Sequence, residues 1–578
     1  MLIALLREHL RPYRRLLLAV VALQFGSTLA ALYLPTLNAD LIDQGIVRGD
    51  TGHILRVGAV MLGFTAIQML AAIAAVYVGA RIAMSVGRDL RAGVFGRVQS
   101  FSGEEIARFG APSLITRTTN DAGQVQAFLL LGFTMAVPAP VSAIGGIALA
   151  LHQDVPLSSV LLVVLPVLVL SVTLLIRAMR PLFRDMQTGI DSVNRILREQ
   201  ITGVRVIRAF VRDEHESARF TEANADLREV SLGTGRLLAM MFPIVLFVVN
   251  AASVSVLWFG GHRIDDGGMQ LGALTAFLSY LMQILFAVMM ATFTLSQMPR
   301  AEVCAERITE VLATEATVVV PAAGVTSMPT PGALELHGVD FRFPGAEQAV
   351  LHGVDLTAVR GGVTAIVGGT GSGKSTLCTL IPRLVDPSAG AVLVGGVNVR
   401  ELDPAALARA VGYVPQRPFL FSGTVATNLA FGRPDASEDE MWAALATAQA
   451  ADFVRAMPEQ LNAPIAQGGS NVSGGQRQRL AIARALIARP DLYVFDDAFS
   501  ALDNATDAAL RAALVPWTAG ATVLIVAQRV GTIRNADRIV VLDGGAVVGT
   551  GTHDELMAGC RCYTEIVLSQ LSAAEAAR

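Results

Sequence analysis

Residues 368–376 of this chain read Gly368-Gly369-Thr370-Gly371-Ser372-Gly373-Lys374-Ser375-Thr376. They follow an apolar run, residues 363–367, that is typical of a buried parallel strand. Residues 376–381 then have the pattern of a helix start. Glycines between a strand and a helix let backbone N–H groups turn towards a phosphate, and the helix start adds partial positive charge. The sequence therefore predicts a loop that binds nucleotide phosphates.

Two side chains of this loop have distinct chemical tasks. We expect Lys374 to reach the terminal phosphates and the hydroxyl of Ser375 to hold Mg²⁺. Lys374 is the only lysine of the chain, and its compact ammonium suits a point-charge contact with phosphate. Pro382 is expected to kink or end the following helix early. The residues predicted to bind the nucleotide are Gly368, Gly369, Thr370, Gly371, Ser372, Gly373, Lys374, Ser375 and Thr376.

The composition indicates a protein that lies partly in lipid. The chain has 578 residues, of which 53% are hydrophobic and 16% are charged. Soluble domains carry about 25% charged residues, so a large part of this chain is expected to sit in a bilayer. The length predicts at least two domains. A net charge of −3 gives no indication of a nucleic-acid partner.

Six apolar runs in the first half are long enough to cross a membrane. The two long loops, after the second and fourth runs, are rich in arginine, whereas the other loops carry few arginines. The positive-inside rule therefore places both long loops and both termini in the cytosol. The near absence of charge inside the runs favours an amphipathic or hydrophobic passenger over an ion. The runs cover residues 16–34, 57–78, 128–151, 155–176, 237–259 and 271–295.

Both long loops show helical periodicity. Apolar residues recur at helical spacing across residues 84–126 and 184–228. This spacing predicts membrane helices that extend well past the bilayer, with each pair joined by a short cross-helix. We expect the tips near residues 112–117 and 203–210. A separate small cytosolic domain in each loop is the alternative.

The second half has the turn density of a soluble α/β domain. We assign residues 1–312 to a transmembrane domain, 313–332 to a linker and 333–578 to a nucleotide-binding domain. Three apolar runs in the last part read as strands and end in polar residues. These residues are Gln416, the pair Asp496 and Asp497, and Gln528, while Ser473-Gly474-Gly475-Gln476 opens a helical segment.

Together these motifs resemble a half-transporter of the ABC superfamily, in the exporter-type arrangement. The chain is most similar to halves of actinobacterial heterodimeric multidrug or lipid exporters. The resemblance implies a membrane α-helical bundle of six transmembrane helices extending into the cytosol, followed by an α/β P-loop ATPase domain. It implies ATP and Mg²⁺, a multi-pass location in the bacterial inner (cytoplasmic) membrane, a second half-transporter as partner, and an amphipathic small molecule or lipid as substrate.

The resemblance also implies roles for single residues. Phe343 takes the place of the aromatic residue, usually Tyr, that stacks on adenine. Gln416 corresponds to the glutamine that touches Mg²⁺, and Asp496 to the aspartate that supports this ion. Residues 473–476 correspond to the signature that contacts ATP in the partner's site, and Asp503 to the loop that crosses to the partner domain. The two tips correspond to coupling helices. The expected metal contacts are thus Ser375, Gln416 and Asp496.

Two residues depart from the family pattern. The family's general base is a Glu, but here it is Asp497, whose side chain is shorter by one methylene. A misplacement near 1 Å can lower a rate on the order of 10²-fold. The family's switch His is Gln528, which can hydrogen-bond a phosphate oxygen but cannot become an imidazolium. The sequence therefore predicts a catalytic set, Asp497, Gln528 and Lys374, that binds ATP and hydrolyses it slowly.

An impaired phosphate-loop site beside an intact signature predicts a heterodimer with unequal sites. In this family each ATP lies between the phosphate loop of one chain and the signature of the other. This chain would then lend its signature to the partner's competent site. The alternatives are a homodimeric exporter, a pseudo-ATPase regulatory subunit, and an importer with exporter-type architecture. The six apolar runs exclude a soluble ATPase of the superfamily.

Overall fold

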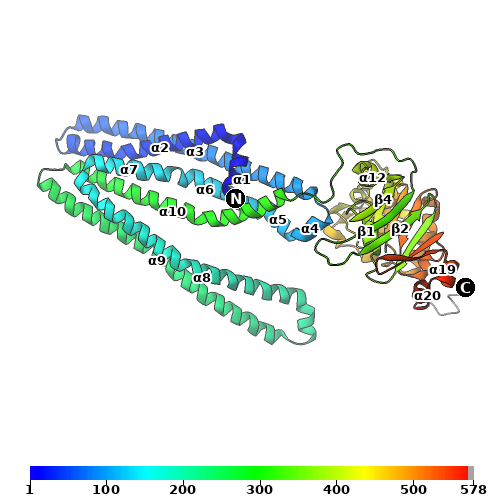
Figure 1. Cartoon of the computed structure of the whole chain (residues 1–578). Helices are drawn as coiled ribbons and strands as arrows, with labels where there is room; N and C mark the ends of the chain where they lie inside the picture. Colours follow the sequence, from blue (N-terminus) through cyan, green and yellow to red (C-terminus); the bar gives the residue numbers. More distant parts are fainter. Residues whose placement is uncertain (571–578) are drawn as a thin grey trace. The chain divides into compact units, whose positions relative to one another are not determined.

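The computed structural model describes residues 1–570 and divides into two compact units (Figure 1). The first unit consists of Met1–Arg97 and Pro112–Ala313, and the second of Val98–Ala111 and the chain from Thr314 onwards. A short segment between two long helices of the first unit therefore belongs to the second unit.

The first unit is entirely helical. Six of its helical stretches are long and apolar enough to cross a membrane, so the six predicted spans are confirmed. Helices suit lipid because every backbone group is bonded within the segment. The fourth stretch has 55 residues and is about 80 Å long, far more than the roughly 30 Å of a hydrocarbon core. The stretches are Leu2–Ile46, Thr51–Gln99, Ala111–Gln153, Val155–Ala209, Asp213–Asp265 and Leu271–Ala313.

Some of these stretches are interrupted by short changes of helix type. Turns of 3₁₀ or π helix, labelled η, join their parts. The elements are α1 (Leu2–Leu10), η1 (Arg11–Tyr13), α2 (Arg14–Asp40), η2 (Leu41–Ile46), α3 (Thr51–Gln99), α4 (Gly103–Phe109), α5 (Ala111–Thr116), η3 (Arg117–Asp121), α6 (Ala122–Leu131), η4 (Gly132–Ala136), α7 (Pro138–Gln153), α8 (Val155–Ala209), α9 (Asp213–Asp265) and α10 (Leu271–Ala313).

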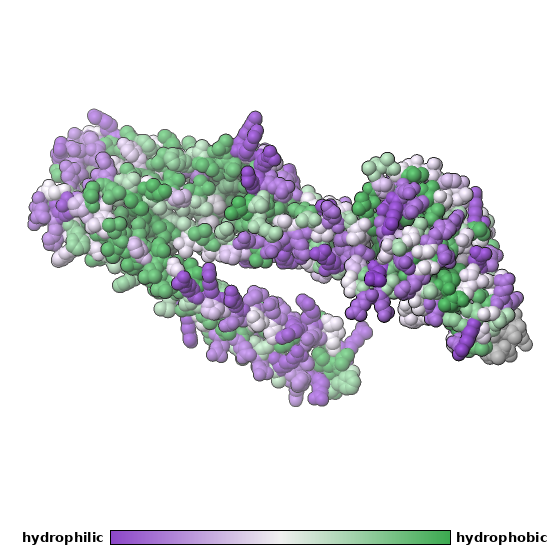
Figure 2. All heavy atoms as spheres, viewed as in Figure 1, coloured by the Kyte–Doolittle hydropathy of each residue, from purple (hydrophilic) through white to green (hydrophobic). Residues whose placement is uncertain are grey.

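Helices α8 and α9 form an antiparallel pair that diverges from the other long helices towards one end (Figure 1). The two backbones approach closely at Gly189, where an added Cβ would lie 3.1 Å from Leu227 Cδ1. Hydrophobic residues cover much of the helical unit, whereas the distal part of the α8–α9 pair is mostly hydrophilic, apart from a hydrophobic patch at its tip (Figure 2). This distribution fits helices that leave the membrane and continue in water.

The structure changes the expected positions of the two tips. Residues 112–117 lie in α5 and the start of η3, within the third long stretch, and the separate short helix is α4 at Gly103–Phe109. Residues 203–209 complete α8, and the turn to α9 occupies only residues 210–212. The prediction was wrong about the first tip and about a separate cross-helix at the second, because helical periodicity continues through both regions.

The second unit is the predicted α/β domain, and its main sheet brings distant segments together. The six strands follow the order β12-β11-β3-β10-β9-β6, with all pairs parallel except β11 with β12. Every residue of strands β9 and β10 is buried and most are apolar, as expected for parallel strands covered on both faces. Since parallel strands end at one edge, the residues after β3, β6, β9 and β10 meet there.

A second sheet, β2-β1-β4-β5, and a pair, β7-β8, complete the unit. Its elements are β1 (Leu334–Phe341), β2 (Leu351–Ala358), β3 (Val363–Gly368), α11 (Lys374–Leu380), β4 (Ala389–Val394), β5 (Val397–Asn398), α12 (Pro404–Ala410), β6 (Val411–Val414), β7 (Gly423–Thr424), α13 (Val425–Ala430), α14 (Glu438–Thr447), α15 (Ala451–Arg455), η5 (Gln460–Asn462), β8 (Pro464–Ile465), η6 (Gln467–Gly469), α16 (Gly474–Ile487), β9 (Leu492–Asp496), α17 (Asn504–Trp517), β10 (Thr522–Val526), α18 (Val530–Ile533), β11 (Arg538–Asp543), β12 (Ala546–Gly551), α19 (His553–Gly559) and α20 (Arg561–Leu568).

Candidate functional site

The loop at residues 369–373 lies between β3 and α11, in the strand-loop-helix context that the sequence predicts. Gly373 has a φ of +94°, which strains any residue with a Cβ, and an added Cβ would also lie 3.0 Å from the Val350 carbonyl oxygen, so the conformation favours glycine. Helix α11 ends at Leu380, because Pro382 lacks the N–H group that would continue it.

Lys374 is tied to the base of this loop. Its Nζ donates to the carbonyl oxygens of Gly368 at 2.8 Å and Gly369 at 2.5 Å. Burial lowers the pKa of the ammonium, while the nearby charges of Asp497 and Asp496 raise it. The single lysine of the chain thus places a positive charge beside the loop and opposite two carboxylates.

Ser375 and Asp496 form a direct contact at the start of α11. The Ser375 hydroxyl donates to Asp496 Oδ1 at 2.9 Å. Burial raises the pKa of Asp496, and the bond from Ser375 lowers it. A hydroxyl and a carboxylate are the hard oxygen ligands that Mg²⁺ prefers, so these residues fit the ion. When bound, Mg²⁺ neutralises charge on the phosphate oxygens.

Asp497 lies between two glutamines. Its Oδ2 accepts hydrogen bonds from Nε2 of Gln416 at 3.1 Å and Nε2 of Gln528 at 3.2 Å. The sheet order explains this meeting, because Gln416 and Gln528 follow the two strands that flank β9. Burial raises the pKa of Asp497, and the hydrogen bond from Gln416 lowers it. The two residues that depart from the family pattern, Asp497 and Gln528, therefore contact each other.

The four residues of the signature begin α16. Ser473 and Gln476 form a reciprocal cap, in which Gln476 N–H donates to Ser473 Oγ at 3.2 Å and Ser473 N–H to Gln476 Oε1 at 2.9 Å. Gly475 lies against the loop before α17, with an added Cβ 3.3 Å from the Ala501 carbonyl oxygen. Asp503 caps α17 through a 2.9 Å bond from Thr506 N–H. The signature and the loop containing Asp503 are thus neighbours.

Phe343 lies just after the end of β1. Its ring packs edge-on against Phe341 with centroids 4.9 Å apart, and 46% of the residue is exposed. Phe343 borders a hollow of about 640 Å³ that also includes Glu104 of α4, and none of the lining residues belongs to the phosphate loop. An exposed aromatic face is available for stacking here.

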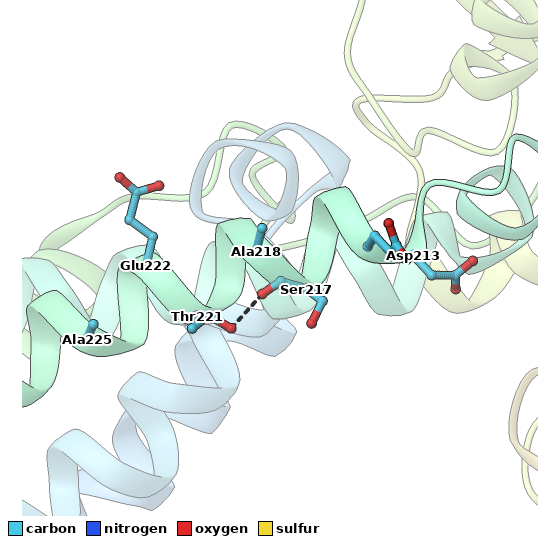
Figure 3. Close-up of a pocket in the computed structure, with 7 residues that line it drawn as sticks. Asp213, Ser217, Ala218, Thr221, Glu222 and Ala225 are labelled. Atoms are coloured by element: carbon cyan, nitrogen blue, oxygen red, sulfur yellow. Dashed lines mark hydrogen bonds between the residues drawn. The ribbon is translucent and has the colours of Figure 1, made fainter.

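A separate hollow of about 750 Å³ runs along the start of α9 (Figure 3). Its lining residues all come from this one helix, and Thr221 Oγ1 donates to the Ser217 carbonyl at 2.8 Å. The side chain of Glu222 points away from these two residues (Figure 3). A single helix face cannot enclose a ligand, so this hollow does not compete with the phosphate-loop site.

Sequence reasoning missed two supporting features. The cap of α4, in which Glu105 accepts from Ser102 N–H at 2.6 Å, carries the recognisable spacing Ser-x-x-Glu. Ser500 donates to the Asp497 carbonyl at 2.8 Å and fixes the backbone of that residue. No local pattern predicts this second bond.

The fold and this site define a multi-pass membrane protein fused to a nucleotide-binding P-loop domain. The profile of the ABC transporter transmembrane region matches residues 17–288, and that of the ABC transporter domain matches residues 351–500. The chain belongs to the ABC transporter family, whose members couple ATP hydrolysis to transport across a membrane.

Relatives and a solved structure agree with this assignment. An uncharacterized ABC transporter ATP-binding protein of Mycobacterium tuberculosis is 52% identical over 579 residues, covering 99% of this chain and 98% of the relative. An ATP-dependent lipid A-core flippase of Chromobacterium violaceum is 31% identical, covering 93% and 91%. The structure of a bacterial Atm1-family ABC exporter with ATP bound has a TM-score of 0.79 at 23% identity, covers 99% of both chains, and supports the fold.

Proposed function

We propose that the chain is one half of a heterodimeric exporter that moves amphipathic or hydrophobic small molecules or lipids across the bacterial inner membrane. Lys374, Ser375 and the loop glycines bind ATP, Phe343 stacks on adenine, and Ser375, Asp496 and Gln416 hold Mg²⁺. The termini, residues 313–332 and the domain at 333–578 then lie on the cytosolic side. Relatives named as lipid A-core flippases and as a putative multidrug exporter support this substrate class.

We also propose that the two ATP sites of the dimer are unequal. The observation that carries this proposal is the contact between Asp497 and Gln528, which occupy the base and switch positions. The shorter carboxylate is held by two amides, and neither amide can accept a proton as an imidazole does. This chain's own site therefore turns over slowly, and Ser473, Gly474 and Gly475 complete the partner's faster site.

Transport is tested with inside-out vesicles that contain the dimer. With ATP outside, a fluorescent amphipathic dye should accumulate inside the vesicles. Accumulation should be abolished when Lys374→Met in this chain is combined with loss of the phosphate-loop lysine of the partner. Dye that leaves preloaded vesicles when ATP is added would indicate import instead. No ATP-dependent dye or lipid movement in either direction would contradict the proposed passenger.

If the two ATP sites hydrolyse at different rates, two substitutions in this chain should have different effects on ATP turnover by the dimer. Ser473→Arg in this chain should lower ATP turnover about hundredfold, because it removes contacts to ATP in the faster site. Lys374→Met in this chain should lower turnover much less, because it affects the slower site. Equal losses from the two substitutions would contradict unequal sites.

A further inference from the structure

Gln570 follows α20 and makes two hydrogen bonds to the loop after β10. Its Oε1 accepts from Val530 N–H at 3.0 Å, and its Nε2 donates to the Gln528 carbonyl at 2.6 Å. One amide therefore holds the backbone on both sides of Arg529. Neither the phosphate loop nor the signature includes Gln570, and the proposed function assigns it no role.

The loop that Gln570 holds delivers a side chain to the ATP site. Gln528 Nε2 donates to Asp497 Oδ2 at 3.2 Å, and Gln416 donates to the same oxygen from the opposite side. The Asp497 backbone is fixed as well, since its N–H donates to Val526 at 3.0 Å. A shift of the Gln528 backbone would therefore change how the carboxylate is held.

We infer that Gln570 is a positioning residue of the ATP site, because it fixes the loop of Gln528, which in turn fixes the carboxylate of Asp497. The inference deepens the proposed function, since it rests on Asp497 occupying the base position. If Gln570 only stabilised the end of α20, its removal would loosen that helix end and leave ATP hydrolysis unchanged. A positioning role also predicts a change in the rate of ATP hydrolysis that depends on Gln528.

The kinetic test uses the full chain in lipid and measures Mg-ATP hydrolysis with protein in excess over radiolabelled ATP, so that slow rates are resolved. Gln570→Ala should lower the rate about tenfold, because loosening the carboxylate by a fraction of 1 Å affects the reaction. The protein concentration that gives the half-maximal rate should stay within about twofold, since the hydrogen bonds of Gln570 go to the loop after β10 and not to the phosphate loop. In the Gln528→Leu background, Gln570→Ala should have no further effect.

Two further variants keep this test interpretable. Gln570→Glu retains the acceptor for Val530 N–H but loses the donor to the Gln528 carbonyl, and its rate should also fall. Gln187→Ala also removes a glutamine hydrogen bond, of 3.2 Å to Asp191, but on the surface of α8, and should leave the rate unchanged. An unchanged rate in both Gln570 variants, or an equal loss with and without Gln528, would overturn the inference.

Hydrogen–deuterium exchange gives a readout that does not depend on turnover. Gln570→Ala should speed exchange in the peptides that contain Val530 and Asp497, and leave β2 unchanged. Faster exchange confined to α20 would overturn the inference. Because every comparison is made between variants of the same site, these outcomes do not depend on whether the two sites of the dimer are unequal.

Discussion

At the scale of single residues, the backbone of Asp497 is as constrained as its side chain. Its φ of +49° lies in the left-handed region, which costs about 1–2 kcal/mol for a residue with a Cβ. Hydrogen bonds to Val526 and from Ser500 maintain this conformation. Such conformations gather at functional sites, where the surrounding structure over-determines them. The backbone conformation of Asp497, directly after β9, thus restricts the direction in which its carboxylate can point.

Ser375 offers a direct test of the metal assignment. Ser375→Ala removes the bond to Asp496 and one proposed ligand of Mg²⁺. The Mg²⁺ concentration needed for half-maximal ATP binding should rise about tenfold, as expected for a loss near 1.4 kcal/mol. The measurement is ATP binding titrated over Mg²⁺, with Ser327→Ala, at an exposed position of the second unit, as the control. An unchanged Mg²⁺ requirement in Ser375→Ala would remove Ser375 from the ligand set.

The site residues differ in how far the sequence could predict them. The phosphate loop is predictable because glycines, lysine and serine occur within nine consecutive residues. The contact between Asp497 and Gln528 joins residues that lie 31 positions apart, and it depends on β9 lying beside β10. Periodicity gives the existence of strands but not their order, so this contact emerges only from the fold.

At the scale of elements, α4 shows how a short helix can be fixed by its first residues. Glu105 is buried and accepts from Ser102 N–H and, through its other oxygen, from Thr317 N–H at 3.0 Å. Thr317 lies in the segment between the last long helix and β1, which the sequence predicts to be a linker. Within the second unit, this carboxylate therefore joins α4 to the linker.

Removing this carboxylate should release α4. Glu105→Ala leaves two backbone N–H groups without their partner, which costs about 1–3 kcal/mol. Amide exchange across residues 98–111 should rise, while exchange in β9 stays the same. Ile106→Ala is the matched control, since Ile106 is 39% exposed on the same helix. Equal exchange in Glu105→Ala and the native chain would show that Glu105 does not hold the helix.

The misplaced first tip has a specific cause. Apolar residues continue at helical spacing through residues 112–126, so periodicity cannot separate a cross-helix from the long helix after it. The capping pattern Ser102-x-x-Glu105 marks the true start of α4, and Gly110, with a φ of +76°, follows its end. Capping residues therefore locate a short helix that hydropathy alone does not resolve.

At the scale of the whole molecule, the six spans predict a sidedness that labelling can test. After replacement of the native cysteines, Asp266→Cys, between α9 and α10, should react with a membrane-impermeant maleimide in intact cells. Glu214→Cys, near the turn between α8 and α9, should react only after the cells are opened. The positive-inside rule gives this expectation. Labelling of Glu214→Cys in intact cells would reverse the orientation.

The central claim is that this chain's own ATP site is slow because of Asp497 and Gln528. Its most direct test is ATP turnover by the chain reconstituted alone, compared with the variant that carries Asp497→Glu and Gln528→His. We predict low turnover for the native chain. In the variant we predict a rise on the order of 10²-fold, because the longer Glu side chain brings the carboxylate back to the position of the family's general base. Turnover at an ordinary transporter rate in the native chain, unchanged by the two substitutions, would contradict the claim.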